Sequence, residues 1–450
     1  MNRMQGHVTR RGFLGATAAT GGTVFAAACG ASGGATDKSP IEGVKPGGTI
    51  SWSFWAVSQE QADNTLARVK DFNDQNPGVK VEAIFGPSGT PYKQKVISLM
   101  SAGTPPECMQ VDAYWMPEFV QQGLLQSMEP YMKGDKSFKL DAFLPGSIME
   151  NHHTFGGKHY AVPNGAESPR VLFYNSLRWR ENGLALPNDL EAQGKWTWDA
   201  FLQHMTKVTQ VVGGNKNWGI NAQLGIGPEP HSWVASNGGK VVSDDLKSFV
   251  GADNKDTIAA LEFQSDLIHK HQVSWKPGED LGTGDSFLNG RVAAVLSGVW
   301  NAAPLFTRPD FTYRIAPLPK SPKGTRKTAV KPNALSIPVG VKGQPAATAW
   351  ELIKFISGPG YQKPQILVGQ VITNLKELVD FFLKNSPVKD AKVFVDAYDN
   401  KDVTPIPLMP RWDEYNVIAN EEMAKMRNGE TTVSVALGNI KSRSSTLLKG

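Results

Sequence analysis

Five tryptophans lie at positions from which a side chain can line a concave site. Trp55, Trp115, Trp233 and Trp300 are each at or near the end of an expected strand or in the loop after it, and Trp412 lies in a proline-rich loop. The flat apolar face of an indole suits the C–H face of a pyranose ring, while carboxylates and amides beside it bind the hydroxyl groups. Any one of the five is equally well explained by core packing, but together they predict two or three that face a ligand.

Two carboxylates fall at comparable positions. Asp112 ends an expected strand, and Glu167 follows another. The carboxyl ends of strands in an open α/β sheet border the ligand crevice, so both side chains are candidates for one pocket. A pair of carboxylates is also the machinery of glycoside hydrolysis. A secreted glycan-degrading enzyme that uses Asp112 and Glu167 is therefore the alternative to a protein that only binds, although 42 acidic residues offer many such pairs.

Other catalytic and cofactor-binding motifs are missing from the sequence. It contains no G-x-x-x-x-G-K-[ST] phosphate loop, no H-E-x-x-H zinc motif and no G-x-S-x-G nucleophile motif. His152 and His153 are adjacent, so their side chains point in different directions on a helix or a strand, which disfavours a shared metal ion. We therefore expect no cofactor, no metal and no enzymatic activity.

The first 28 residues have the pattern of an export signal. They carry three arginines and no acidic residue, followed by a weakly apolar run that ends in three alanines. That run is too short and too weakly apolar to predict a transmembrane helix. The stretch around Arg10 and Arg11 resembles the twin-arginine motif, which directs the export of folded chains. A basic signal for the general export route is the alternative.

Cys29 directly follows the three alanines, as in a bacterial lipoprotein box, where the cysteine becomes the lipid-carrying N-terminus. Ala26 stands where leucine is usual, and plain cleavage that leaves a free thiol is the alternative. The glycine-rich run that follows predicts a flexible tether over residues 29–46. We expect an exported protein that is lipid-anchored on the outer face of the cell membrane, in the periplasm or outside the cell.

The net charge says little about partners. The chain has 450 residues and a charge of +5, but the export signal takes three arginines and no acid with it, so 422 residues and a charge of +2 remain. The densest cationic cluster consists of Lys320, Lys323, Arg326, Lys327 and Lys331, and two prolines interrupt it. We expect a solvated loop there and no nucleic-acid partner, because a nucleic-acid footprint needs a basic patch on one face.

Alternating helix and strand patterns follow the signal. Period-2 strands are expected at 50–54 and 79–83, with a helix over 60–75 between them, and a short strand is expected at 109–112. A second unit begins near Tyr160. Its expected elements are strands at 171–174, 292–296 and 315–318 and a helix over 198–212 that Thr197 caps. This alternation predicts an α/β protein with more than one sheet.

An ordered set of motifs resembles the extracellular solute-binding proteins of ABC importers, in particular the sugar-binding, maltodextrin-binding-like family 1. The stretch Gly-Lys-His-Tyr-Ala-Val-Pro at 157–163 and Leu-Phe-Tyr-Asn at 172–175 are typical of that family. Residues 287–300 resemble its F-x-x-G-x-x-A-M-x-x-x-G-x-W signature, with Val295 in place of the methionine. The resemblance covers nearly all of residues 47–450.

The resemblance implies a periplasmic-binding-protein-like fold of type II, in which two α/β lobes are joined by a multi-strand hinge and the ligand binds between them. It assigns residues 47–163 and 335–375 to an N-terminal lobe, and residues 168–330 and 376–450 to a C-terminal lobe. The protein would be a monomer that captures a sugar or oligosaccharide and delivers it to the ABC permease in the membrane.

The resemblance also assigns roles to single residues. Glu167 matches a carboxylate that binds sugar hydroxyls in maltodextrin-binding members, and Trp300 matches a sugar-stacking position. Trp412 lies near another stacking position, while Asp112 and Trp115 fall in a loop that contacts the ligand in many members.

Two other solutes remain open on the same fold. A polyamine would use the aromatic side chains together with a more acidic cleft. A phosphorylated polyol would need a cation in the cleft, for which Arg170 and Arg411 are the candidates.

Overall fold

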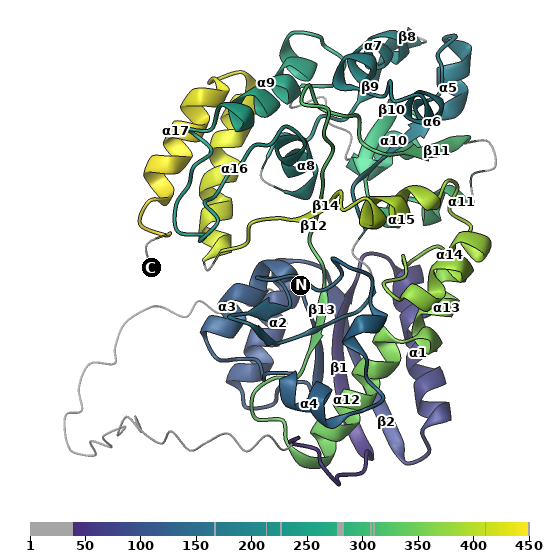
Figure 1. The fold of residues 1–450 in the computed structure, drawn as a ribbon, viewed down its shortest axis with the longest axis vertical. Coiled ribbons are helices and arrows are strands. Elements are labelled where there is room, and N and C mark those ends of the chain that lie inside the picture. The colour runs from purple at the N-terminus through teal and green to yellow at the C-terminus, as the bar shows by residue number, and fades with distance from the viewer. Residues whose placement is uncertain are drawn as a thin grey trace, which may run out of the picture. The chain divides into compact units, whose positions relative to one another are not determined.

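Two five-stranded sheets organise the chain (Figure 1). The computed structural model describes residues 39–165, 168–212, 214–225, 227–276, 283–306, 308, 311–409 and 411–448. The expected class is confirmed, because helices alternate with strands along most of the chain and form more than one sheet.

The first sheet has the strand order β2-β1-β3-β13-β6. Its strands are β1 (Gly48–Ala56), β2 (Val79–Pro87), β3 (Cys108–Val111), β6 (Val162–Pro163) and β13 (Ala334–Ser336). Strands β1, β2 and β3 are parallel, and alternate residues of β1 (Ile50, Trp52 and Phe54) point into the core. Gly78 has φ 90°, a left-handed conformation that glycine adopts without strain in the turn before β2.

Strand β13 joins parts of the chain that are far apart in sequence. It pairs antiparallel with β3 on one side and with β6 on the other. In Figure 1 this green strand lies among the purple and blue strands of the first sheet. The chain therefore leaves the first sheet after Pro163 and returns to it at Ala334.

The second sheet has the order β11-β7-β10-β9-β8. Its strands are β7 (Val171–Asn175), β8 (Gln210–Val212), β9 (Asn215–Ile220), β10 (Val292–Ser297) and β11 (Tyr313–Ala316). Every residue of β10 is buried, as expected of a central strand covered on both faces. A short ladder of β12 (Thr328–Val330) and β14 (Val403–Pro405) and a hairpin of β4 (Thr154–Phe155) and β5 (Lys158–His159) complete the strands described.

Helices cover both sheets. Those in the N-terminal third are α1 (Gln59–Gln75), α2 (Thr90–Ser101), η1 (Ala113–Trp115), α3 (Met116–Gln121), α4 (Glu129–Gly134) and η2 (Leu140–Ala142). The middle of the chain forms α5 (Ser176–Glu181), α6 (Pro187–Ala192), α7 (Trp198–Val208), α8 (Pro228–Ser236), α9 (Lys255–His269), α10 (Thr283–Leu288), η3 (Val299–Asn301) and α11 (Ala303–Phe306). The last third forms α12 (Gly343–Ser357), α13 (Pro359–Leu367), η4 (Lys376–Leu378), α14 (Val379–Asn385), α15 (Lys392–Asp399), α16 (Trp412–Asn428) and α17 (Val433–Ser444).

The sequence pattern predicts the start of helix α7 correctly but not its end. Its expected cap is confirmed, because the Thr197 side chain accepts a hydrogen bond from the Ala200 N–H. The prediction of a helix through residue 212 is wrong, since α7 stops at Val208. The next residues form β8, which makes a tight antiparallel pair with β9 and thereby competes with the helix for Val211.

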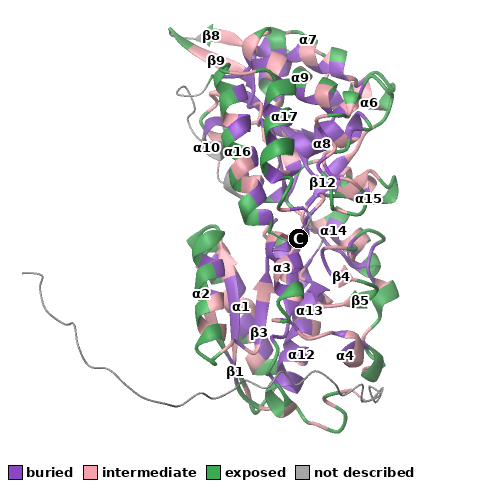
Figure 2. Ribbon diagram, turned by 90° about the vertical axis from the view of Figure 1, so that its left-hand side faces the viewer, coloured by how far each residue is buried: buried purple, intermediate pink, exposed green. Residues whose placement is uncertain are grey.

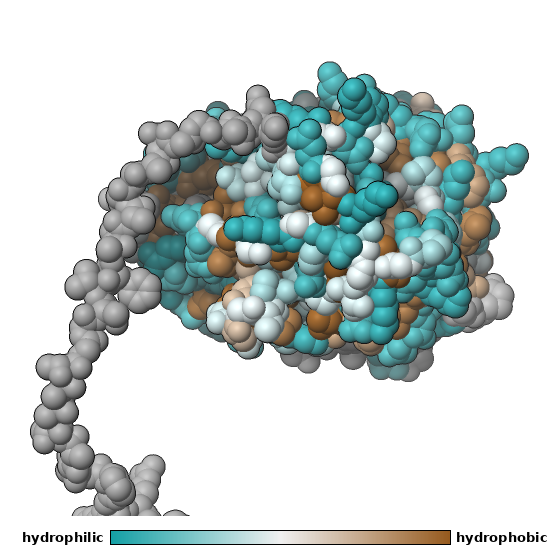
Figure 3. Space-filling view, turned by 90° about the horizontal axis from the view of Figure 1, so that it is seen from below, coloured by the Kyte–Doolittle hydropathy of each residue, from teal (hydrophilic) through white to brown (hydrophobic). Residues whose placement is uncertain are grey.

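Burial separates the strands from the outer helix faces. In Figure 2 the strands in the interior are mainly purple, whereas the outward faces of helices such as α2 and α17 are green or pink. The end of the molecule seen in Figure 3 is mainly hydrophilic, with hydrophobic residues scattered among the polar ones. The free thiol of Cys108 is fully buried in β3, and burial raises its pKa, so this cysteine is an inert core residue.

Candidate functional site

A cavity of about 510 Å³ lies between elements of the first sheet and segments that flank strands of the second sheet. We call it the aromatic cavity. It is lined at the ends of β1 and β3, by η1 and α1, at the crossing after β6, by η3, and by the N-terminus of α16. The volume falls in the range of small-molecule sites.

The aromatic cavity gathers most of the residues singled out from the sequence. Four of the five expected tryptophans line it, namely Trp55, Trp115, Trp300 and Trp412, and Asp112 lines it as well. The tryptophans come from β1, from η1, from η3 just after β10, and from the first residue of α16, so Trp412 begins a helix and does not lie in the proline-rich loop that we expected. Sequence positions as far apart as 55 and 412 therefore contribute to one wall.

The aromatic rings contact one another in two groups. Trp55 packs edge-on against Trp115, with centroids 6.1 Å apart, and against Tyr92 at 5.3 Å. Tyr114 stacks on Trp412 with a centroid distance of 5.1 Å and an angle of 11° between the planes. Edge-on and stacked pairs are both favourable arrangements, so the rings hold each other in place as platforms.

Trp300 is held differently. Its side chain is 40% exposed, and the guanidinium of Arg170 lies 4.8 Å from the ring centroid. Arg170 itself is buried, and its Nε donates to Glu229 at 2.9 Å while Nη1 donates to the Ser168 carbonyl at 2.9 Å. A Cβ at Gly298 would collide with the Trp300 ring, so the glycine allows the indole to lie against the backbone.

Asp112 pairs with a cation from the returning chain. Its Oδ2 lies 2.7 Å from Lys331 Nζ, and its Oδ1 accepts the Tyr114 N–H at 3.0 Å, which caps η1. Both side chains of this ion pair are largely buried. Lys331 Nζ also lies 4.8 Å from the centroid of the Tyr114 ring, within reach of a cation–π interaction.

A second ion pair borders the aromatic cavity beside Trp412. Lys93 of α2 contacts Asp413 of α16 at 2.6 Å and Glu118 of α3 at 2.7 Å. Burial alone would lower the pKa of Lys93, but the hydrogen bonds to Asp413 and Glu118 raise it above its ordinary value. Lys93 therefore stays charged and links α2 to α16.

Two expected site residues do not line the aromatic cavity. Trp233 belongs to helix α8 and is buried against Trp198 and Phe201 in the core under the second sheet, so its placement in a ligand-facing loop is wrong. The Trp233 indole is in the core because it lies on the face of α8 that packs against α9, where it contacts Phe263. Arg411 is paired with Glu414 in solvent, which leaves Arg170 as the candidate cation in the cavity.

Several predictions lie outside the described residues. These are the sugar-binding role of Glu167, the twin-arginine signal at Arg10 and Arg11, and the lipidation of Cys29. Among the described residues, no group of three or more histidine, cysteine or acidic side chains is arranged to hold a metal ion. No helix in that same part of the chain is long and apolar enough to span a membrane.

The cationic cluster at 320–331 is only partly the solvated loop that we expected. Lys331 is buried against Asp112 in the aromatic cavity, and Arg326 is buried against Glu191. Tyr114 was also missed, although it stands in the same short turn as Asp112 and Trp115. The signal for Lys331 was its place between the segments 168–330 and 335–375, which the resemblance assigns to different lobes, because a charge at such a junction is less solvated than one in a free loop.

Comparisons with known proteins identify the family and the fold. The family model for the bacterial extracellular solute-binding protein matches residues 56–363. A Brucella abortus relative described as a binding protein is 23% identical over 395 residues, which cover 84% of this chain and 88% of the relative.

Two solved structures are similar over almost their whole length. The ABC substrate-binding protein Lmo0181 of Listeria monocytogenes, solved with cycloalternan, has a TM-score of 0.76 at 20% identity and covers 89% of this chain and 98% of its own. The sugar-binding protein MalE of Xanthomonas citri has a TM-score of 0.73 at 23% identity and covers 89% and 97%. The two-lobed type II periplasmic-binding-protein fold predicted from the sequence is thereby confirmed.

Proposed function

The chain belongs to the bacterial extracellular solute-binding protein family, and from that premise we propose that it is the component of an ABC importer that binds an uncharged sugar or oligosaccharide. The observation that supports this most is the aromatic cavity, in which stacked rings stand beside charges that are already paired. The Xanthomonas citri neighbour is itself described as a sugar-binding protein.

The charges of the aromatic cavity favour a neutral ligand. Within the described part of the chain, four charged side chains line it, and each has a partner of opposite sign. The pairs are Asp112 with Lys331, Arg170 with Glu229, and Asp413 with Lys93. A charged solute such as a phosphorylated polyol or a polyamine that paired with Arg170 or Asp112 would displace Glu229 or Lys331 and leave it largely buried without a counter-charge, which is costly.

The aromatic rings supply the complementary feature. Trp300 presents an indole that is 40% exposed and Trp55 is partly exposed, whereas Trp115 and Trp412 are each only 5% exposed and mainly support the neighbouring rings. The C–H face of a pyranose can stack on such rings, while the paired carboxylates and the amide of Asn333 bind its hydroxyls. A ligand that touches both sheets favours the closed arrangement by differential affinity, so binding and closure are coupled.

A ligand screen tests this proposal. The mature chain is melted with maltose, maltotriose, mannotriose, tagatose, glucose 6-phosphate and spermidine, and any hit is titrated by calorimetry. A ligand that binds only the native state raises the melting temperature, so we expect at least one neutral sugar to do so. Stabilisation by spermidine or glucose 6-phosphate alone would replace the neutral sugar with a charged solute.

The position of the protein in the cell is part of the same proposal. Export through the signal at Arg10 and Arg11, followed by lipidation of Cys29, would hold the protein close to the permease that receives the sugar. More than one acyl chain on the cysteine gives stable anchoring. We expect Cys29→Ser to move the protein from the membrane fraction to the soluble exported fraction, and retention in the membrane would contradict lipidation.

The hydrolytic alternative has less support. Both oxygens of Asp112 are engaged, one by Lys331 and one by the Tyr114 N–H, so this carboxylate is poorly placed to act as an acid or a nucleophile. Incubation with the oligosaccharides of the screen, followed by product analysis, should show no cleavage. Turnover that Glu167→Gln abolishes would establish an enzyme instead.

A further inference from the structure

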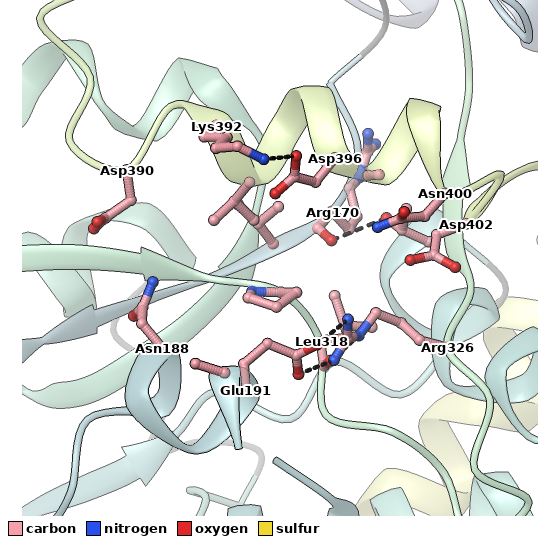
Figure 4. A pocket seen from close by; sticks show the side chains of 16 residues that line it. Arg170, Asn188, Glu191, Leu318, Arg326, Asp390, Lys392, Asp396, Asn400 and Asp402 are labelled. Atoms are coloured by element: carbon pink, nitrogen blue, oxygen red, sulfur yellow. Dashed lines mark hydrogen bonds and ion pairs between the residues drawn. The ribbon is translucent and has the colours of Figure 1, made fainter. Parts of the chain in front are cut away.

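A second cavity, of about 320 Å³, lies between α15, α6 and the β11 end of the second sheet (Figure 4). We call it the α15 cavity. It shares only Arg170 with the aromatic cavity. Much of its wall is apolar, formed by Val171, Ala192, Pro317, Leu318, Val393 and Ala397.

Most charges around the α15 cavity are neutralised. Three of its four carboxylates are ion-paired to described residues: Glu191 with Arg326, Asp390 with Arg314, and Asp396 with Lys392. Figure 4 shows the pair of Glu191 and Arg326 on one side and that of Lys392 and Asp396 on α15 opposite it. These groups therefore shape the cavity without giving it a net charge.

Asp402 is the exception. Its carboxylate makes no ion pair and no hydrogen bond with a described residue, although it lies on the same side of the cavity as Arg326. Arg326 directs three of its five N–H donors elsewhere, since Nη1 and Nη2 bond to Glu191 and Nε bonds to the Leu318 carbonyl, and none of these bonds reaches Asp402. Burial raises the pKa of Asp402 above its ordinary value, against the lowering effect of Arg326 and Lys327.

We propose that the α15 cavity binds a small primary ammonium ion with an apolar body, its ammonium on Asp402 and its hydrocarbon part against Leu318 and Val393. An ammonium offers three N–H donors to a carboxylate that lacks partners, and the apolar walls bury the alkyl chain. A divalent metal fits less well, because it needs several oxygen ligands and Asp402 is the single uncommitted carboxylate among the described lining residues. The volume is at the lower end for small-molecule sites and suits a body of this size.

The test uses the mature chain and three probes of equal length: hexylammonium, hexanol and hexanoate. Calorimetry and melting curves at pH 7 should show that hexylammonium binds and stabilises the protein, while hexanol and hexanoate bind at least tenfold more weakly. Asp402→Asn should weaken hexylammonium at least tenfold. The matched control Asp396→Asn, which changes an already paired carboxylate of the same cavity, should bind like the wild type.

Ala397→Phe keeps Asp402 and fills the cavity from α15, so it should also abolish binding. It serves as the second test if Asp402→Asn does not fold. Three results would overturn the proposal. They are no binding of hexylammonium to the wild type, binding of hexanol as tight as that of hexylammonium, or wild-type affinity for hexylammonium in Asp402→Asn or Ala397→Phe. None of these depends on whether the aromatic cavity binds a sugar, so the two proposals fail separately.

Discussion

Trp300 is the most exposed tryptophan of the aromatic cavity, and its contribution to binding can be measured on its own. With 40% of the side chain exposed, Trp300→Ala removes a stacking surface without opening a hole in the core. We expect the affinity for the sugar to fall by about 1–3 kcal/mol, or roughly 5- to 150-fold, while the melting temperature of the free protein changes little. Calorimetry and melting curves check both parts.

Trp233 provides the contrast. It is 5% exposed and packs against Trp198, Phe201 and Phe263 in the core. Trp233→Ala should lower the free energy of unfolding by about 3–5 kcal/mol, because it leaves a large void. If Trp300→Ala destabilised the protein as much as Trp233→Ala does, the assignment of Trp300 to the ligand would be wrong.

Gly298 leads to a prediction about a residue that lies beneath the ring. A Cβ there would collide with the Trp300 indole, so Gly298→Ala should push the ring out of position. We expect a loss of sugar affinity that approaches that of Trp300→Ala, and no additional loss when both changes are combined. Fully additive losses would mean that Gly298 acts elsewhere.

The residue scale also shows how far the sequence can lead. Residue type and position after a strand were enough to select Trp55, Trp115, Trp300 and Trp412, which line one cavity. The same reasoning failed for Trp233, because we expected a loop at a position that forms helix α8. This reasoning also missed the role of Lys331 in the cavity, since Lys331 pairs with Asp112, which is 219 residues away in the sequence.

At the scale of elements, helix α8 is tied to the strand β12 that leads to Lys331. The Ser232 hydroxyl is fully buried, accepts the Ala329 N–H at 2.9 Å and donates to the Pro228 carbonyl at 2.6 Å. Ser232→Ala leaves the Ala329 N–H without a partner, so we expect a loss of about 1–3 kcal/mol in the free energy of unfolding. Urea denaturation measures this loss.

Thr206→Ala is the matched control for that change. The Thr206 hydroxyl bonds only to the Leu202 carbonyl on an exposed face of α7, and no N–H depends on it. Its removal should change the stability by less than about 0.5 kcal/mol. Equal losses for the two variants would argue against a structural role for the bond between α8 and β12.

Elements with a strong local period were predictable, and those defined by distant partners were not. The expected strand at 50–54 and the helix over 60–75 agree with β1 and α1, because their apolar residues recur at the period of the element, and the expected strand at 171–174 agrees with β7, which is a short continuous apolar run. Strands β6 and β13 are two and three residues long and are strands because of distant partners: β13 pairs with both β3 and β6. Segments of two or three residues are too short to show the hydrophobic periodicity of a strand.

At the scale of the whole molecule, buried histidines predict sensitivity to acid. Burial lowers the pKa of His152, His204 and His231 to about 4 and that of His153 to about 3. His153 and His204 each accept a hydrogen bond at Nδ1, from the Met149 N–H and from the Trp179 indole N–H, and both bonds require a neutral ring.

The sign of the effect follows from these values. Below the unfolded pKa of 6.5 the unfolded chain binds protons at these rings that the native protein excludes. The free energy of unfolding should therefore fall as the pH drops from about 6.5 to 4, by up to about 1.4 kcal/mol per pH unit for each histidine. Urea denaturation at pH 7.5, 6 and 5 checks this, and a stability that does not change over that range would contradict it.

The place of β13 in the first sheet also sets the order in which the protein can be completed. A ribosome has made every strand of the second sheet before it reaches residue 334, yet the first sheet still lacks the strand that connects β3 to β6. In a nascent chain or a fragment that ends before β13, the backbone groups of β3 and β6 that pair with β13 in the complete protein have no partner. Both strands are then exposed sheet edges. A single cut cannot divide this chain into two pieces that each contain one complete sheet. Both cavities also include residues from the end of the chain, so a nearly full-length chain is required before either cavity is complete.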